Sequence, residues 1–168
     1  MIWIEKNIEL IDETDKKLLQ NMIENFVVFD NPDGKTNHYV RATVAPKSIN
    51  KSEINLYNYI KEKIHLKENY KLISVWINKV EAETNKNDNF HRDRSNLTSV
   101  TYLNDDFIGG EFCYINEDGH EIKIQPKKYL TIFSNDKLQH KVLPVESGVR
   151  YSLVCFYMYQ KKNKETII

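Results

Sequence analysis

The chain has 168 residues, of which 40% are hydrophobic and 29% are charged, a composition typical of one globular domain with its own core. Lysine and arginine together number 24, as do aspartate and glutamate, so the formal net charge is zero. A neutral chain has no general basic field, which argues against nucleic acid or an anionic membrane surface as a partner.

The sequence begins without a cationic segment followed by an apolar one, and no later run has the length of a membrane span. We therefore expect a soluble, cytoplasmic protein. Cys113 and Cys155 both fall in apolar, strand-like runs, and the chain has no CxxC pair. We expect two reduced core cysteines rather than a structural zinc site.

The N-terminal half combines helical and strand patterns. Apolar residues at helical spacing predict an amphipathic helix over residues 14–26 and a second over 52–64, which Ser52 can cap. The runs at 26–30 and 38–44 are typical of strands separated by an NPDG turn. We predict that residues 1–70 form a helical support region with short strands.

The second half changes character and becomes a series of short runs rich in β-branched and aromatic residues. These runs lie at 71–80, 97–103, 110–115, 120–125, 128–133, 140–145 and 149–159, with glycine-containing turns at 109–110, 118–119 and 146–148. Such spacing favours a sandwich or barrel. The predicted fold is therefore α+β but mainly β, a double-stranded β-helix (jelly-roll) barrel over 71–160, supported by the N-terminal helices within a single domain, 1–168.

His91 and Asp93 lie one residue apart, so in extended backbone their side chains project from the same face. Taken alone, the pair is also what surface residues at the end of a strand look like. His140 follows 49 residues after His91 (140 − 91), far enough for several strands to return the chain to the same face. Two histidines and one carboxylate can form a facial triad that holds iron(II) and leaves coordination positions open for catalysis.

Arg150 lies ten residues beyond His140 (150 − 140), in a strand that leads into an apolar run. A guanidinium directed into a barrel needs an anion to offset its desolvation. A dicarboxylate cosubstrate can supply that anion.

With these features the sequence resembles the iron(II) and 2-oxoglutarate dependent dioxygenases, and within them the prolyl 4-hydroxylase-like branch. The matching segments are HRD at 91–93, TYLNDDFIGGEF at 101–112 and HKVLPVESGVRYS at 140–152. The resemblance implies Fe(II), 2-oxoglutarate and O2 as reactants, with ascorbate as a reductant. It also implies that His91, Asp93 and His140 bind the iron.

The same resemblance implies roles for residues around the cosubstrate. Arg150 would form a two-pronged salt bridge with the distal carboxylate of 2-oxoglutarate, and Tyr102 and Ser152 would reach the same carboxylate. Relatives place a tyrosine about ten residues before HxD to contact the keto acid; this chain has none there, and Asn78 is the candidate replacement. Gly109 and Gly110 are expected to form a tight turn.

Several functions remain open. The first is hydroxylation of a peptidyl residue such as proline, and the second is hydroxylation of a free amino acid or another small metabolite. Nucleic-acid dealkylating relatives carry a second arginine six residues after the oxoglutarate arginine, where this chain has Phe156. A non-enzymatic cupin-like metal-binding module, or a zinc site on the same residues, is the alternative from another class. Arg92 and Arg94 are expected to point away from the metal, as solvated residues or as contacts to a substrate.

Overall fold

The computed structural model describes residues 2–5, 13, 14, 16, 17, 20, 38–43, 69–82 and 89–160. Residues 13, 14, 16, 17 and 20 have helical backbone, and the rest of the helix predicted over 14–26 lies outside the described residues. The predicted helix over 52–64 and the predicted strand over 26–30 lie outside them as well. Among the described residues, no helix has the length and hydropathy of a membrane-spanning segment.

The described part of the chain is mainly β, as predicted. Its strands are β1 (Ile2–Glu5), β2 (His38–Thr43), β3 (Tyr70–Glu81), β4 (Leu97–Tyr102), β5 (Ile108–Gly109), β6 (Phe112–Ile115), β7 (Glu121–Ile124), β8 (Thr131–Asn135), β9 (His140–Val142), β10 (Val145–Ser147) and β11 (Val149–Tyr159).

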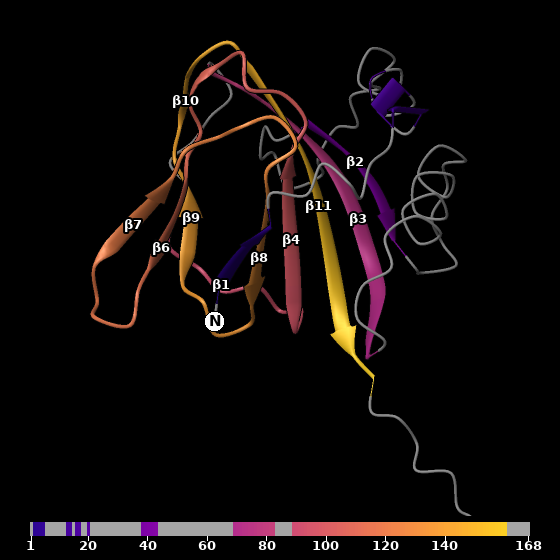
Figure 1. Cartoon of the computed structure of the whole chain (residues 1–168), viewed down its shortest axis with the longest axis vertical. Helices are drawn as coiled ribbons and strands as arrows, with labels where there is room; N and C mark the ends of the chain where they lie inside the picture. Colours follow the sequence, from indigo (N-terminus) through magenta and orange to yellow (C-terminus); the bar gives the residue numbers. More distant parts are fainter. Residues whose placement is uncertain are drawn as a thin grey trace, which may run out of the picture.

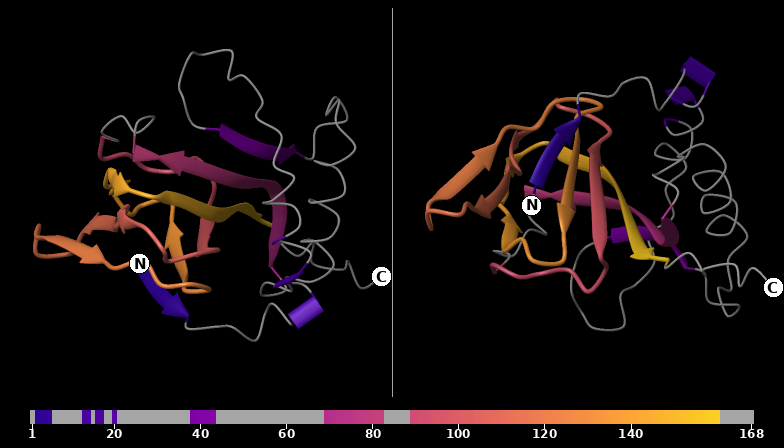
Figure 2. Two further views of the ribbon diagram at one scale, coloured as in Figure 1. Left: turned by 90° about the horizontal axis from the view of Figure 1, so that it is seen from above. Right: turned by 60° about the horizontal axis from the view of Figure 1, so that its bottom comes forward.

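The strands form one large and two small antiparallel sheets (Figure 1). The large sheet has the order β1-β8-β4-β11-β3-β2, the second has the order β7-β6-β9, and β10 pairs with β5 alone. The β7-β6-β9 sheet lies beside the half of the large sheet that contains β1 and β8 (Figures 1 and 2). This arrangement is consistent with a jelly roll.

Side chains from both sheets meet in one buried cluster. Tyr102 of β4 and Ile132 of β8 pack with Phe112 of β6 and with Leu138, and all four are at most 8% exposed. The register of β11 against β4 places Ser152 directly opposite Tyr102, so both side chains project toward this interior. β4 and β11 therefore direct Tyr102 and Ser152 into the interior between the two sheets.

Three strands are absent from the sequence prediction. β1 pairs with β8 across most of the chain, with Ile2 opposite Ser134. β5 and β10 have two and three residues and pair around Gly109 and Val145. Runs this short carry too little alternation to be recognised in the sequence.

Candidate active site

Three side chains from two distant segments meet at one end of the β7-β6-β9 sheet. Nε2 of His91 lies 3.9 Å from Oδ1 of Asp93, and Nε2 of His140 lies 3.7 Å from Oδ2. One possible ligand atom from each residue lies within 4.8 Å of the others. Because ligand atoms lie about 2.1 Å from a bound first-row metal, two ligands of one ion are about 4 Å apart at most. Both measured distances to Asp93 satisfy that limit, and the 4.8 Å bound for the whole set exceeds it by less than 1 Å.

Backbone pairing brings the two histidines together. The His91 amide donates to the His140 carbonyl at 2.8 Å, and the His140 amide donates to the His91 carbonyl at 2.9 Å. Residues paired in this way project their side chains from the same face, and the two ring centroids are 4.5 Å apart. The prediction that His91 and Asp93 project from a strand needs one correction, because His91 forms an isolated bridge and β4 begins only at Leu97.

Each imidazole is oriented by a backbone carbonyl two residues before it. Nδ1 of His91 lies 2.9 Å from the carbonyl oxygen of Asn89, and Nδ1 of His140 lies 3.2 Å from that of Leu138. Because a carbonyl can only accept, each Nδ1 must carry the proton, which leaves the Nε2 lone pair for a metal. Every residue type has a backbone carbonyl, so the sequence gives no signal for these contacts.

The aromatic ring of Phe112 fixes His140 further. The two rings are stacked, with centroids 5.0 Å apart and an interplanar angle of 15°. Phe112 is also in the buried cluster with Tyr102, so one side chain connects the histidine to the interior. Phe112 was expected in a strand and ends one of the segments that carry the family resemblance, but its contact with His140 was not predicted.

The three candidate ligands differ in their exposure to solvent. The His140 side chain is 7% exposed and that of Asp93 is 14% exposed, whereas the His91 side chain is 43% exposed. The cluster therefore opens to the surface on the side of His91.

Arg150 and Tyr102 lie deeper, and both are directed to one carbonyl. Arg150 is 6% exposed and Tyr102 is 1% exposed. The Arg150 guanidinium (Nη1) donates to the Gly110 oxygen at 3.4 Å, and the Tyr102 hydroxyl donates to the same oxygen at 3.3 Å. Burial raises the pKa of Tyr102 to about 12, although the Arg150 charge acts in the opposite direction. The hydroxyl is therefore a neutral hydrogen-bond donor at physiological pH.

The raised pKa of Tyr102 predicts an alkaline limit to stability. The folded state favours the neutral phenol, so Tyr102 contributes to the free energy of unfolding. This contribution is intact below pH 10 and is lost as pH rises from 10 towards 12. The loss amounts to about 3 kcal/mol for a pKa shift of this size. Denaturant unfolding of wild-type protein and of Tyr102→Phe from pH 8 to 11.5 measures it. The variant should lose stability less steeply above pH 10, and parallel curves would contradict the assignment.

Three polar side chains form a row across β3, β11 and β4. Ser152 pairs with Asn78 on one side and with Tyr102 on the other. Ser152 is 1% exposed, and its hydroxyl has no hydrogen-bond partner among the described residues. A buried hydroxyl without a partner costs free energy, so this row suits a polar ligand. The structure thus places Asn78, Ser152 and Tyr102 side by side and Arg150 two residues before Ser152.

An aromatic pair lies further along the same strands. The ring centroids of Trp76 and Phe156 are 4.8 Å apart in an edge-to-face arrangement. The Trp76 indole donates to the Ser74 hydroxyl at 2.7 Å. Both aromatic side chains are only half-buried. Phe156, at the position where nucleic-acid dealkylating relatives carry a second arginine, therefore packs against Trp76.

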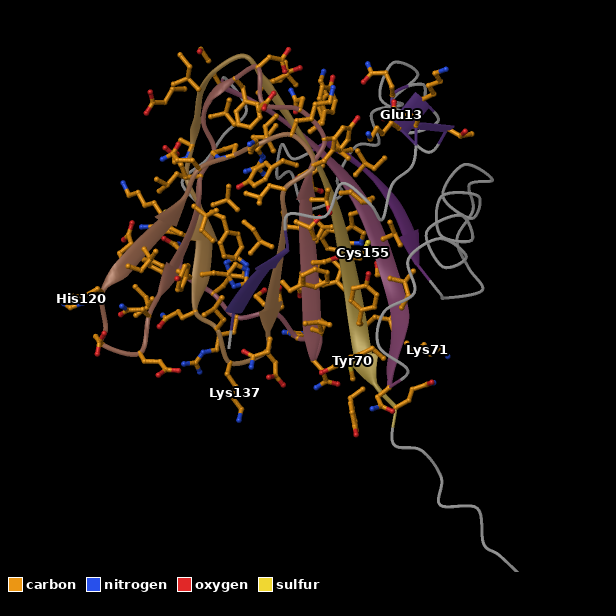
Figure 3. The ribbon with its side chains drawn as sticks, in the orientation of Figure 1. Glu13, Tyr70, Lys71, His120, Lys137 and Cys155 are labelled. Atoms are coloured by element: carbon orange, nitrogen blue, oxygen red, sulfur yellow. The ribbon has the colours of Figure 1, made fainter. Side chains whose placement is uncertain are left out.

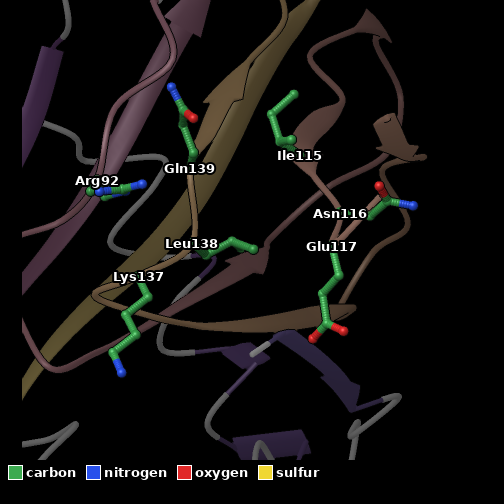
Figure 4. A pocket seen from close by; sticks show the side chains of 7 residues that line it. All are labelled: Arg92, Ile115, Asn116, Glu117, Lys137, Leu138 and Gln139. Carbon is green, nitrogen blue, oxygen red and sulfur yellow. The ribbon is translucent and has the colours of Figure 1, made fainter. Parts of the chain in front are cut away.

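Arg92 and Arg94 are exposed, as solvated residues would be, and their direction relative to the metal stays a prediction. Arg92 borders a surface hollow of about 250 Å³ (Figure 4), lined by Arg92, Ile115, Asn116, Glu117, Lys137, Leu138 and Gln139. Lys137 lies at the same end of the molecule as Tyr70 and Lys71, where β3 begins (Figure 3). The hollow adjoins the histidines in sequence, because Gln139 directly precedes His140 and Arg92 directly follows His91.

Residues 76–158 match the profile of the 2OG-Fe(II) oxygenase superfamily, a range that contains all the candidate site residues named above. The chain belongs to this superfamily. It is a dioxygenase, and the family implies Fe(II) and 2-oxoglutarate as its metal and cosubstrate. No curated protein matches the sequence significantly.

Solved structures show the same fold at low sequence identity. An oxidoreductase of the 2OG-Fe(II) oxygenase family from Burkholderia pseudomallei has a TM-score of 0.68 at 17% identity, covering 94% of this chain and 84% of its own. A Pseudomonas putida prolyl-4-hydroxylase has a TM-score of 0.55 at 16% identity, covering 96% and 92%. SnoK, an alpha-ketoglutarate dependent carbocyclase from nogalamycin biosynthesis, has a TM-score of 0.60 at 13% identity, covering 93% and 81%.

The residues of this dioxygenase fit both groups that the family implies. Two imidazoles and one carboxylate form the donor set of non-heme iron(II) sites, and their Nε2 and Oδ atoms converge. Arg150 and Ser152 are both buried, and a guanidinium and a hydroxyl are groups of the kind that bind a carboxylate. Among the described residues, no second group of three such ligands is found.

Proposed function

We propose that this dioxygenase couples the oxidative decarboxylation of 2-oxoglutarate to succinate and CO2 with hydroxylation of an unactivated C–H bond in a peptidyl residue such as proline. The observation that carries the chemistry is a continuous set of contacts. The metal-ligand candidate His140 stacks on Phe112, Phe112 packs with Tyr102, and Tyr102 shares the Gly110 carbonyl with Arg150.

In this proposal His91, Asp93 and His140 hold the iron, which supplies the redox chemistry that activates O2. The Nδ1 contacts to Asn89 and Leu138 orient both imidazoles and leave each Nε2 lone pair available to the ion. Three protein ligands leave positions open on a six-coordinate ion, as catalysis needs. Ascorbate would keep the iron in the ferrous state.

Arg150 binds the distal carboxylate of 2-oxoglutarate through its planar guanidinium, a task for which a fork of N–H groups suits better than an ammonium. Tyr102 and Ser152 donate hydrogen bonds to the same carboxylate. Asn78 lies next to Ser152 in the row and contacts the keto-acid end. Because these side chains are buried or half-buried, they exclude water from the bound cosubstrate.

A residue carried on a polypeptide suits the opening on the side of His91. A ligand that is 43% exposed lies close to the surface, so a side chain presented by a peptide can reach the metal without entering a deep tunnel. The fold similarity to a Pseudomonas putida prolyl-4-hydroxylase supports proline as the first residue to test. A screen that compares proline-containing peptides with free amino acids distinguishes peptidyl from free substrates, and turnover of free amino acids alone would contradict the peptidyl assignment.

The proposed chemistry can be tested before a substrate is known. Fe(II) and then 2-oxoglutarate are added anaerobically to the apoprotein, and the visible charge-transfer band of a chelated keto acid is recorded. We expect the band in the wild type and its loss in Asp93→Ala. Metal binding without a band would argue against the roles of Arg150 and Tyr102 and would favour a metal-binding module.

A further inference from the structure

Gly110 lies between the two residues proposed to bind the distal carboxylate of 2-oxoglutarate. Its carbonyl oxygen accepts hydrogen bonds from both the Tyr102 hydroxyl and the Arg150 guanidinium, at 3.3 and 3.4 Å. We infer that Gly110 is a positioning residue of the cosubstrate site, whose carbonyl and missing side chain together set the placement of Arg150 and Tyr102. This inference rests on the proposed function of those two residues.

Position 110 has little room for a side chain. A Cβ atom at position 110 would lie 3.1 Å from Cδ of Arg150, 3.1 Å from Cε2 of Phe107 and 3.3 Å from Cγ2 of Val145. Gly110 also has φ +69°, a backbone conformation that L side chains rarely adopt. A side chain at position 110 would therefore crowd the stem of Arg150 and would displace it by a few tenths of an ångström.

The backbone fixes the direction of the Gly110 carbonyl. The Gly110 amide donates to the Pro144 carbonyl at 2.8 Å, and the Leu143 amide donates to the Glu111 carbonyl at 2.9 Å. These bonds tie the segment on both sides to the connection between β9 and β10. The Gly110 oxygen is thus a fixed reference point rather than a group that follows its partners.

The Gly110 oxygen is an acceptor that orients its two donors, Arg150 and Tyr102. The guanidinium is planar, so a contact between Nη1 and the Gly110 oxygen favours one orientation of the whole fork, although at 3.4 Å this bond is also a long one. The Tyr102 hydroxyl has one hydrogen, so it can donate to Gly110 or to a carboxylate, but not to both. At 3.3 Å its bond to Gly110 is longer than the usual range for O–H···O, and a charged carboxylate forms the stronger bond. The carbonyl therefore holds the hydroxyl in place and releases it readily to the cosubstrate.

The test compares Gly110→Ala with Gly119→Ala. Gly119 has φ +81°, but a Cβ atom added there would have no other atom within 4 Å, so the control carries the backbone strain without the contacts. Dissociation constants of 2-oxoglutarate and of pyruvate are measured on the anaerobic Fe(II) protein. Pyruvate has the keto acid but no distal carboxylate. In Gly110→Ala we expect 2-oxoglutarate to bind about 10-fold more weakly or worse, with pyruvate unchanged. Gly119→Ala should match the wild type for both.

Each other result has a defined meaning. If the wild type does not prefer 2-oxoglutarate over pyruvate, the roles of Arg150 and Tyr102 are wrong and the inference fails with them. If the wild type shows the preference and Gly110→Ala keeps it, only the inference on Gly110 is overturned. Equal weakening of both ligands also overturns it, because the effect is then not directed at the distal carboxylate.

A second variant covers the case in which Gly110→Ala does not fold. In a Phe107→Leu background the Cε2 atom that the new Cβ would meet is gone, whereas the contact with Arg150 stays. Gly110→Ala in this background is compared with Phe107→Leu alone. The same selective loss of 2-oxoglutarate affinity is expected, and an unchanged ratio to pyruvate overturns the inference.

Discussion

Replacing Arg150 with methionine is expected to raise the dissociation constant of 2-oxoglutarate about 100-fold or more, while Fe(II) binding stays unchanged. Arg150 is 6% exposed, so a carboxylate that meets it is removed from water, and losing one partner of a buried charge pair costs about 2–5 kcal/mol. Methionine fills similar space without charge, which keeps the packing of β11 intact. Anaerobic titration of the Fe(II) protein with 2-oxoglutarate measures the change.

Two further arginine variants make that result specific. Arg150→Lys keeps the charge but not the planar fork, so its affinity should lie between those of the wild type and Arg150→Met. Arg94→Met removes an exposed arginine and should bind 2-oxoglutarate like the wild type. Wild-type affinity in Arg150→Met would mean that the carboxylate contacts another group, and the roles assigned to Tyr102 and Ser152 would fall with it.

The candidate ligands could be predicted from the sequence because their residue types carry the chemistry. Histidine and aspartate can bind a metal where the fold brings them together, and His91, Asp93 and His140 do meet. The same holds for Arg150 and Tyr102, which share one acceptor. The spacing of the strands allowed the three candidate ligands to meet, the family resemblance implied that Arg150 and Tyr102 act together, and the roles of all five residues in binding stay predictions.

What orients these side chains could not be predicted, because it is backbone. The carbonyl oxygens of Asn89, Leu138 and Gly110 accept from the site residues, and every residue type has a carbonyl. The glycine pair was expected to form a tight turn, whereas Gly109 lies in β5, opposite Val145 of β10. Gly109 has φ +80°, which suits a turn. The sequence gives no sign that this residue also pairs with Val145.

Long-range pairing explains the strands that were missed. β1 has four residues and gains its partner only in β8, where Trp3 lies opposite Phe133. Such a segment is too short to be recognised as a strand from its own residues, and its partner lies far along the chain at the edge of β8. The register that aligns Asn78, Ser152 and Tyr102 is likewise a property of three strands together. Sequence spacing within one strand fixes the face of each residue but not its neighbours.

Replacing Asp93 with alanine is expected to weaken metal binding more than about 100-fold, since even the outer-shell partners of metal ligands are worth 10–100-fold. Asp93 is the carboxylate between the two histidines, 3.9 Å from Nε2 of His91 and 3.7 Å from Nε2 of His140. Thermal unfolding with increasing Mn(II), a probe that does not oxidise readily, measures the effect. A metal at 100 times its dissociation constant stabilises the folded state by about 2.7 kcal/mol, so the wild type should show a clear rise in Tm and Asp93→Ala none.

The control for this loss is a carboxylate elsewhere on the surface. Asp118 is exposed in the turn between β6 and β7, and Asp118→Ala should retain the full rise in Tm with Mn(II). Without metal, Asp93→Ala and the wild type should unfold at similar temperatures, because Asp93 is partly exposed and makes no core contact in the buried cluster. A similar apoprotein Tm and a missing metal response together assign Asp93 to the ion rather than to folding. If Asp93→Ala kept the metal response, the ion would be held without this carboxylate, and the facial triad would have to be assigned to other residues.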